Sequence, residues 1–458
     1  MIAIPRPRRD LRWTVAGFVC GGLAGLTVLT SGVVAAAVDA WPATRPVTTE
    51  RGLRDVLHTP PLLVARGQRV NLRYDAVCQS DGLGKLCELA GDVFVRGSRE
   101  FAFRRVPLVA SEGSTLSATL NGVTASGGFS YYAIIQDGSG SAITVPAGGA
   151  TAPQRAWTVP AMTAAALRVH TFGRARRPDE RRVSTSWGAG ADTLGLISGR
   201  GQATIGPSAF DLDPDGSLTI LDQVNDRLAV YPVGGKPPRY LPIAFDGGEG
   251  DLAIGVDGTR YVLDQASGSV VRTYTPAGAL AGTARIDDHG ADMLRAGPGG
   301  ALVHAYPGDM WLPVSRAGLP LEPTAQVAAA RAGRSVGGGV EIVVHADPTE
   351  ALFALVRGDR VLRAWRLTSA TTIGEVQLVE PFDDGLLAVI RVWTERQAEF
   401  VVVVLTPAGL SRSFSVEAVE WAESAPLGRF RLNRETLFQL RSAPSGAEIV
   451  SFDIGGAK

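Results

Sequence analysis

Apolar and polar residues alternate in short runs along the chain from residue 62 onward, and Gly-rich and Ser-rich turns separate the runs. In the segment 70–75, for example, Val70, Leu72 and Tyr74 alternate with polar residues. A period of two is typical of a β-strand with one buried face, whereas a helix repeats its apolar residues every three or four positions. The pattern therefore predicts an all-β protein over this part of the chain.

One long apolar segment departs from the alternation. Residues 14–38 contain no charged residue, and arginines precede them at positions 6, 8, 9 and 12. A helix needs about 20 apolar residues to cross a bilayer, and flanking arginines favour the cytoplasmic side. We predict a cytoplasmic segment 1–13 and a transmembrane helix or uncleaved signal anchor over 14–38, with the remaining chain extracellular or periplasmic. A cleaved signal peptide ending near Ala35–Ala37 is the alternative.

Strand signals begin after a linker over 39–60, in which 53–57 is expected to be a short helical piece. Short alternating runs separated by Gly, Ser and Asp clusters then occupy 61–160. They predict a small antiparallel β-sandwich, immunoglobulin-like in general form. A basic connector is expected over 161–182, with a helical turn at 164–167.

The cysteines bear on the compartment. Cys78 and Cys87 bracket a short polar loop, while Cys20 lies in the apolar segment. Disulfides persist in oxidising, extracytoplasmic compartments, so we predict a disulfide bond between Cys78 and Cys87.

A glycine returns at a fixed interval in the C-terminal part of the chain. Gly216, Gly258 and Gly300 each follow the previous one after 42 residues, and the segment 221–223 is matched by 263–265. A period of about 40–45 residues with internal turn signals predicts the blades of a β-propeller. Residues 183–458 suffice for six blades, and we expect a strand near 183–187 to complete the last blade and close the ring.

The first repeat carries a more specific signal. Residues 207–231 hold an inner strand, an Asp-x-x-Gly hairpin, a strand that ends at Asp222, and an Asn-x-Arg hairpin made by Asn225 and Arg227. This segment resembles an NHL repeat, although the next repeat has Gly-Ser-Val at 268–270 in place of Asn-x-Arg. The resemblance implies a six-bladed propeller. Propellers of this type include extracellular sensor domains, scaffolds, nucleic-acid binders, and a few lyases and lactonases.

Polar residues expected on the inner strands are acidic in the early repeats and basic in the late ones. A channel mouth with this asymmetry can hold a charged ligand. The candidates are Asp211, Asp251, Asp292, His345, Arg391, Arg429 and Arg431.

A metal site has weaker support. A D-x-D-x-D-G pattern resembles a calcium loop, but we favour a plain hairpin turn, because the flanking segments are predicted to be strands and position 12 is Asp rather than Glu; its carboxylates are Asp211, Asp213, Asp215 and Asp222. The five histidines show no metal-ligand spacing. We therefore expect no cofactor, with calcium as the alternative.

Charge and motifs bound the function. The 45 basic residues balance the 45 acidic ones, and no basic stripe interleaved with aromatic residues is present, so nucleic-acid binding is not expected. No nucleophile-elbow, Walker or Rossmann motif occurs. We expect a membrane-tethered extracytoplasmic binding or scaffold protein, with protein, peptide or glycan partners at the cell surface, rather than an enzyme. The alternative is a propeller-type lyase or lactonase with its active site at the channel mouth.

Overall fold

The computed structural model describes residues 52–79, 88–111, 113–122, 127–201, 203–247, 249–266, 268–286, 290–306, 309–422 and 428–455. These residues belong to one compact unit. The predicted membrane segment 14–38 and both Cys20 and Cys87 lie outside them, so the membrane helix and the disulfide remain predictions. Within the ranges described, no helix is long and apolar enough to cross a membrane.

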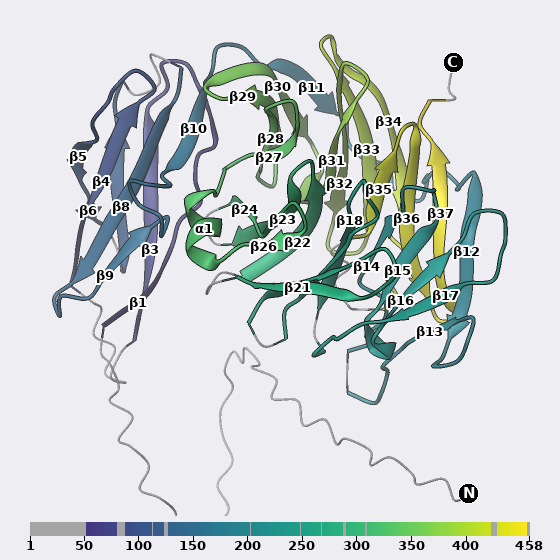
Figure 1. Cartoon of the computed structure of the whole chain (residues 1–458). Helices are drawn as coiled ribbons and strands as arrows, with labels where there is room; N and C mark the ends of the chain where they lie inside the picture. The colour runs from purple at the N-terminus through teal and green to yellow at the C-terminus, as the bar shows by residue number, and fades with distance from the viewer. Residues whose placement is uncertain are drawn as a thin grey trace, which may run out of the picture. The chain divides into compact units, whose positions relative to one another are not determined.

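The N-terminal part forms two sheets that share one apolar core (Figure 1). The first sheet has the order β1 (Gly52–Leu57), β3 (Val70–Gln79), β7 (Thr115–Leu120), β6 (Val109–Ala110). The second has the order β2 (Leu63–Ala65), β10 (Gln154–Val159), β8 (Phe129–Asp137), β4 (Leu89–Gly97), β5 (Arg104–Pro107), with β9 (Ala142–Val145) also on β8. The alternation predicted for 70–75 is confirmed, because Val70, Leu72 and Tyr74 are buried between the sheets.

Six sheets of three to five strands follow among the described residues. The first sheet has the order β14 (Ala209–Leu212), β15 (Leu218–Asp222), β16 (Arg227–Tyr231), β17 (Arg239–Pro242). The second has the order β18 (Gly250–Ile254), β19 (Arg260–Asp264), β20 (Val270–Tyr274), β21 (Leu280–Arg285). The third has the order β22 (Gly290–Gly297), β23 (Gly300–Tyr306), β24 (Met310–Pro313). Between this sheet and the next lie the hairpin β25 (Ser315–Arg316)–β26 (Leu319–Pro320) and the short helix α1 (Pro323–Ala328).

The other three sheets complete the set. The fourth sheet has the order β27 (Arg334–Gly337), β28 (Val340–Ala346), β29 (Glu350–Arg357), β30 (Arg360–Ser369), with β11 (Thr163–Leu167) at its edge. The fifth has the order β31 (Thr372–Phe382), β32 (Gly385–Trp393), β33 (Ala398–Thr406), β34 (Gly409–Glu417). The sixth has the order β35 (Phe430–Asn433), β36 (Thr436–Ala443), β37 (Gly446–Asp453), β12 (Glu180–Trp187), β13 (Thr193–Leu194).

The inner strands of these sheets contact one another in a closed cycle. The contacts run from β14 to β18, β18 to β22, β22 to β27, β28 to β31, β31 to β35, and from β35 back to β14. Antiparallel sheets arranged around a ring in this way form a β-propeller, so the predicted fold is confirmed at that level. The 42-residue period reflects equivalent hairpins, since Gly216 and Gly258 occupy the β14–β15 and β18–β19 turns with φ of 83° and 80°.

The strand predicted near 183–187 is also confirmed. It is the second half of β12, which pairs antiparallel with the final strand β37, and Thr185 lies opposite Ala447. A segment from the start of the ring therefore completes the last sheet and covers the edge that β37 would otherwise expose.

Two local predictions were wrong. Residues 53–57 form β1, paired with β3, and residues 164–167 form most of β11, which pairs parallel with β30. Both segments were expected to be helical, the second because alanine favours helices. Pairing with an open sheet edge outweighs that propensity, and Ala165 lies there opposite Leu367 in a buried cluster.

The two-sheet part and the propeller share a buried contact. Leu62, Leu63, Trp157 and Val159 join an apolar cluster with residues of the β18, β22 and β28 sheets. The Trp157 indole N–H donates to the carbonyl of Gly358 at 3.0 Å. This contact places the N-terminal strands against the β22 and β28 sheets.

Candidate functional site

Aspartate carboxylates join the inner strands of neighbouring sheets. Asp211 on β14 accepts a hydrogen bond from the Ile254 amide on β18 at 2.8 Å. Asp251 on β18 does the same for the Leu294 amide on β22 at 2.7 Å. Both residues were predicted as channel-mouth ligand groups, and the structure gives each of them a structural bond to the next sheet.

Buried arginines complete this cluster. Arg431 lies 3.3 Å from Asp211 and 3.4 Å from Asp251, and Arg295 lies 3.3 Å from Asp251. Burial lowers the pKa of Arg295 to about 10, so its guanidinium stays charged at neutral pH. Burial raises the pKa of Asp211, while Arg431 acts in the opposite direction. The predicted acidic and basic inner residues therefore bind one another across the ring.

The other two candidate arginines form a separate group. Arg391 and Arg429 each donate to a different oxygen of Glu420, both at 2.9 Å. Burial lowers the pKa of Arg429 to about 10, and Glu420 opposes this shift. Sequence reasoning missed Glu420, which follows β34 and lies outside the inner strands.

A cavity of about 290 Å³ lies between the β22, β28 and β31 sheets. We call it the His304 pocket. Its polar wall includes Asp292, His304, Asp309, Trp311, His345 and Glu375. Ile342, Val344 and Leu378 contribute to its apolar wall. Two of the predicted candidates, Asp292 and His345, are thus brought to one cavity.

His304 is held between two carboxylates in this pocket. Its Nδ1 lies 2.7 Å from Asp292, and its Nε2 lies 2.7 Å from Asp309. Burial by itself lowers the pKa of His304, but the hydrogen bonds and charges of the two aspartates outweigh it and raise the pKa to about 10. At neutral pH the ring is therefore an imidazolium that donates from both nitrogens.

Sequence reasoning did not select His304. The signal that could have found it is its spacing, because Asp292 and Asp309 lie 12 residues before it and 5 residues after it. The hairpin from β22 to β23 brings Asp292 back beside His304, and the following turn supplies Asp309.

We expect the His304 ring of the full chain, labelled with ¹³C-histidine, to remain protonated up to about pH 9. The raised pKa of about 10, against 6.5 for an unperturbed ring, also makes His304 contribute to stability. That contribution is complete below pH 6.5 and is lost as the pH rises through 10. Since Asp292 is half-exposed, we expect a loss of only about 2 kcal/mol.

NMR titration of the full chain, with His304→Gln to assign the signal, checks this expectation. A midpoint near 6.5 would show that the two carboxylates do not hold the proton. If the thermal unfolding midpoint of His304→Gln fell as steeply between pH 7 and 10 as that of the wild type, His304 would not be the cause of the loss of stability.

The four aspartates of the calcium-loop pattern have different partners. Asp211 faces Arg431, and Asp213 forms a buried ion pair with Arg260. Asp215 accepts the amide of Ser217 in the hairpin turn, and Asp222 accepts the amide of Gly195 and pairs with Arg227. Among the residues that the structure describes, no group of three or more His, Cys, Asp and Glu side chains is arranged to hold a metal ion.

The residues behind the NHL resemblance have structural roles. Asp222 is fully buried, and it accepts hydrogen bonds from Asn225 at 2.8 Å and Arg227 at 2.7 Å. In the second sheet, Asp264 pairs with Arg272 at 2.5 Å. Arg272 thus pairs with the strand-end aspartate of this repeat, as Arg227 does in the first repeat, although the Asn-x-Arg motif is missing.

Comparisons with known proteins add little. A scan against protein-family models found no match, and a search of curated proteins found none. A virginiamycin B lyase from Staphylococcus aureus is similar over 57% of this chain and 98% of that one, with 11% identity and a TM-score of 0.36. A streptogramin B lyase is similar over 54% of this chain and 92% of that one, with 10% identity and a TM-score of 0.33. A Bacteroides thetaiotaomicron protein of unknown function is similar over 90% of this chain and 100% of that one, with 11% identity and a TM-score of 0.32. Since these scores are low, the fold rests on the strand pairing above, and the lyases carry no inference about activity.

Proposed function

We propose that this protein is a binding protein that takes a basic side chain of a protein or peptide partner into the His304 pocket. The observation that carries the proposal is the charge of the pocket mouth. Asp292, Asp309 and Glu375 place three carboxylates there against the single His304 imidazolium. A negative mouth in a partly apolar cavity attracts a cation.

The deeper charges of the pocket do not offset this. Arg295 is paired with Asp251, and Arg334 lies 2.9 Å from Glu380. These buried guanidiniums are neutralised by their own partners, so the carboxylates at the mouth determine which ligand charge is favoured. The apolar wall at Ile342 and Val344 suits the aliphatic stem of a lysine or arginine side chain.

The protonation of His304 also supports binding over catalysis. A lyase or lactonase at the channel mouth needs a group that exchanges protons near the working pH. With a pKa of about 10, His304 keeps its proton at neutral pH and is a poor general base there.

The proposal extends to the placement of the protein. We infer that the six sheets are the blades of an NHL-type propeller, supported by the resemblance of residues 207–231. We further infer an extracytoplasmic propeller tethered by the segment 14–38, with a Cys78–Cys87 disulfide. Protease treatment of intact cells should then remove the propeller, and full protection of the propeller would reject this topology.

An array of peptides that differ only in one central residue tests the binding function. We expect the full chain to be retained by the Arg and Lys peptides and not by their Glu and citrulline counterparts. Asp292→Asn/Glu375→Gln should lose this preference, because it removes two carboxylates from the mouth. Glu395→Gln removes an exposed carboxylate from the β32–β33 turn and should keep it. Equal retention by the Arg and Glu peptides would reject the proposal.

A further inference from the structure

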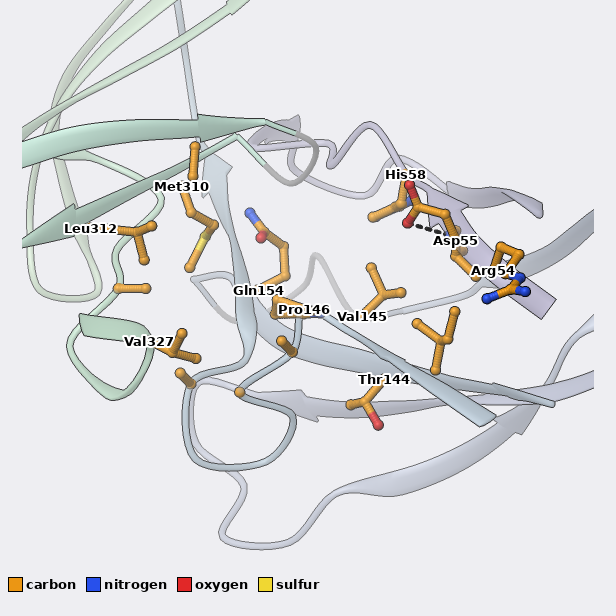
Figure 2. A pocket seen from close by; sticks show the side chains of 17 residues that line it. Arg54, Asp55, His58, Thr144, Val145, Pro146, Gln154, Met310, Leu312 and Val327 are labelled. Carbon is orange, nitrogen blue, oxygen red and sulfur yellow. Dashed lines mark hydrogen bonds between the residues drawn. The ribbon is translucent and has the colours of Figure 1, made fainter. Parts of the chain in front are cut away.

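A second cavity, of about 440 Å³, lies between the N-terminal sheets and the β22 sheet. We call it the seam cavity, and Figure 2 shows its lining. One wall comes from β1, β9, β10 and the segment 145–148, and the other comes from β23, β24 and α1. Its apolar side chains include Val56, Val145, Pro146, Met310, Leu312 and Val327.

One polar group in this lining is buried without a partner. Gln154 on β10 is 1% exposed, and its Nε2 has no hydrogen-bond partner. Figure 2 shows the Gln154 side chain among the cavity residues, between Met310 and Val145. A buried N–H group that makes no hydrogen bond costs free energy, and rotation of the amide toward an acceptor placed in the cavity would recover it.

The buried histidine of this lining already has a hydrogen-bond partner for each ring nitrogen. His58 Nδ1 lies 2.7 Å from the Arg73 carbonyl, which can only accept, so Nδ1 carries the proton. Its Nε2 then accepts from the Tyr131 hydroxyl at 2.8 Å. Burial lowers the pKa of His58 to about 4, so the ring is neutral at physiological pH.

The buried part of the lining therefore carries no net charge. Arg54 and Asp55 line the cavity from exposed positions on β1, while His58 and Gln154 are uncharged. Burying a charged ligand group against such a wall is unfavourable. The volume lies in the range of small-molecule sites.

We propose that the seam cavity binds a small uncharged molecule with an apolar body and a carbonyl oxygen that accepts a hydrogen bond from Gln154 Nε2. The apolar body packs on Met310 and Leu312 from the propeller and on Val145 from the N-terminal sheets. Such a ligand contacts both parts of the chain at once. This site is separate from the His304 pocket, and the proposal does not depend on the function of that pocket.

A matched pair of probes tests the proposal on the full chain. The first is 4-phenylbutan-2-one, and the second is its isostere in which a methylene group replaces the carbonyl oxygen. Dissociation constants come from ligand-observed NMR. We expect the ketone to bind about fivefold more tightly than the isostere, the factor that one net hydrogen bond contributes.

Two variants locate the binding. Gln154→Leu removes the amide at similar size, so it should abolish the preference for the ketone while the isostere binds as before. Val327→Trp fills the cavity from α1 and should weaken both probes. If Gln154→Leu does not fold, the probe pair in the wild type together with Val327→Trp still decides.

Three results would overturn the proposal. They are equal affinity of the wild type for both probes, a ketone preference that survives in Gln154→Leu, and failure of both probes to bind up to their solubility limits. The last result would mean that water alone occupies the cavity.

Discussion

Asp251→Asn should lower the free energy of unfolding by about 3–5 kcal/mol, the usual cost of removing one member of a buried charge cluster. Asp251 is fully buried, accepts the Leu294 amide from the next sheet, and faces both Arg295 and Arg431. Asparagine keeps the size of the side chain but leaves two buried guanidiniums without this counter-charge. Thermal and urea unfolding of the full chain measure the loss.

The control for this change is Asp383→Asn. Asp383 is exposed and has a φ of 50°, a backbone conformation that asparagine also tolerates. We expect a change within about 0.5 kcal/mol there. If Asp251→Asn destabilised the protein no more than Asp383→Asn, the hydrogen bonds and ion pairs of the inner carboxylates would not hold neighbouring sheets together.

Gly446→Ala should disrupt the pairing of β12 with β37 that closes the ring. We expect it to lower the free energy of unfolding by about 3 kcal/mol, as steric overpacking does. Gly446 begins β37 with a φ of 151°, and a Cβ atom there would lie 1.9 Å from the carbonyl oxygen of Thr185 on β12. The methyl group would therefore push β12 away from the strand that it pairs with. Hydrogen exchange should quicken in β12 and β37 before it does in the other sheets.

Gly234→Ala provides the matched comparison. Gly234 has a φ of 85°, but a Cβ atom there would meet nothing within 4 Å. It carries the backbone strain without the clash, so we expect a cost of about 1 kcal/mol and no local change in β12. Equal effects of the two substitutions would contradict the role assigned to β12.

Local sequence signals predicted the propeller because its hairpins are local. The turns at Gly216 and Gly258 need a positive φ, and Asp222 binds Asn225 and Arg227 only a few residues away. Such features repeat in the sequence at the same interval as in the structure. The strand β11 was missed because its partner β30 lies about 200 residues later, and only the finished sheet offers that edge.

The site was predicted only in part for the same reason. Asp211, Asp251 and Arg431 were selected as ligand groups, yet Arg431 reaches Asp251 across 180 residues of chain. Their mutual pairing exists only once the ring closes, so the sequence could not distinguish paired charges from available ones. Asp292 and His345, which were selected as channel-mouth ligand groups, both line the His304 pocket, whereas the carboxylates on both sides of His304 became visible only in the folded hairpin.

The most direct test of the account is a calorimetric titration of the full chain with the peptide Ala-Ala-Arg-Ala-Ala and with its citrulline counterpart. The two peptides have nearly the same shape and differ in charge. We expect the wild type to bind the arginine peptide about tenfold more tightly, which corresponds to about 1.4 kcal/mol. Asp292→Asn/Glu375→Gln should bring this ratio close to one. Equal affinities in the wild type, or a ratio that persists in the double variant, would contradict the claim that the His304 pocket binds a basic group.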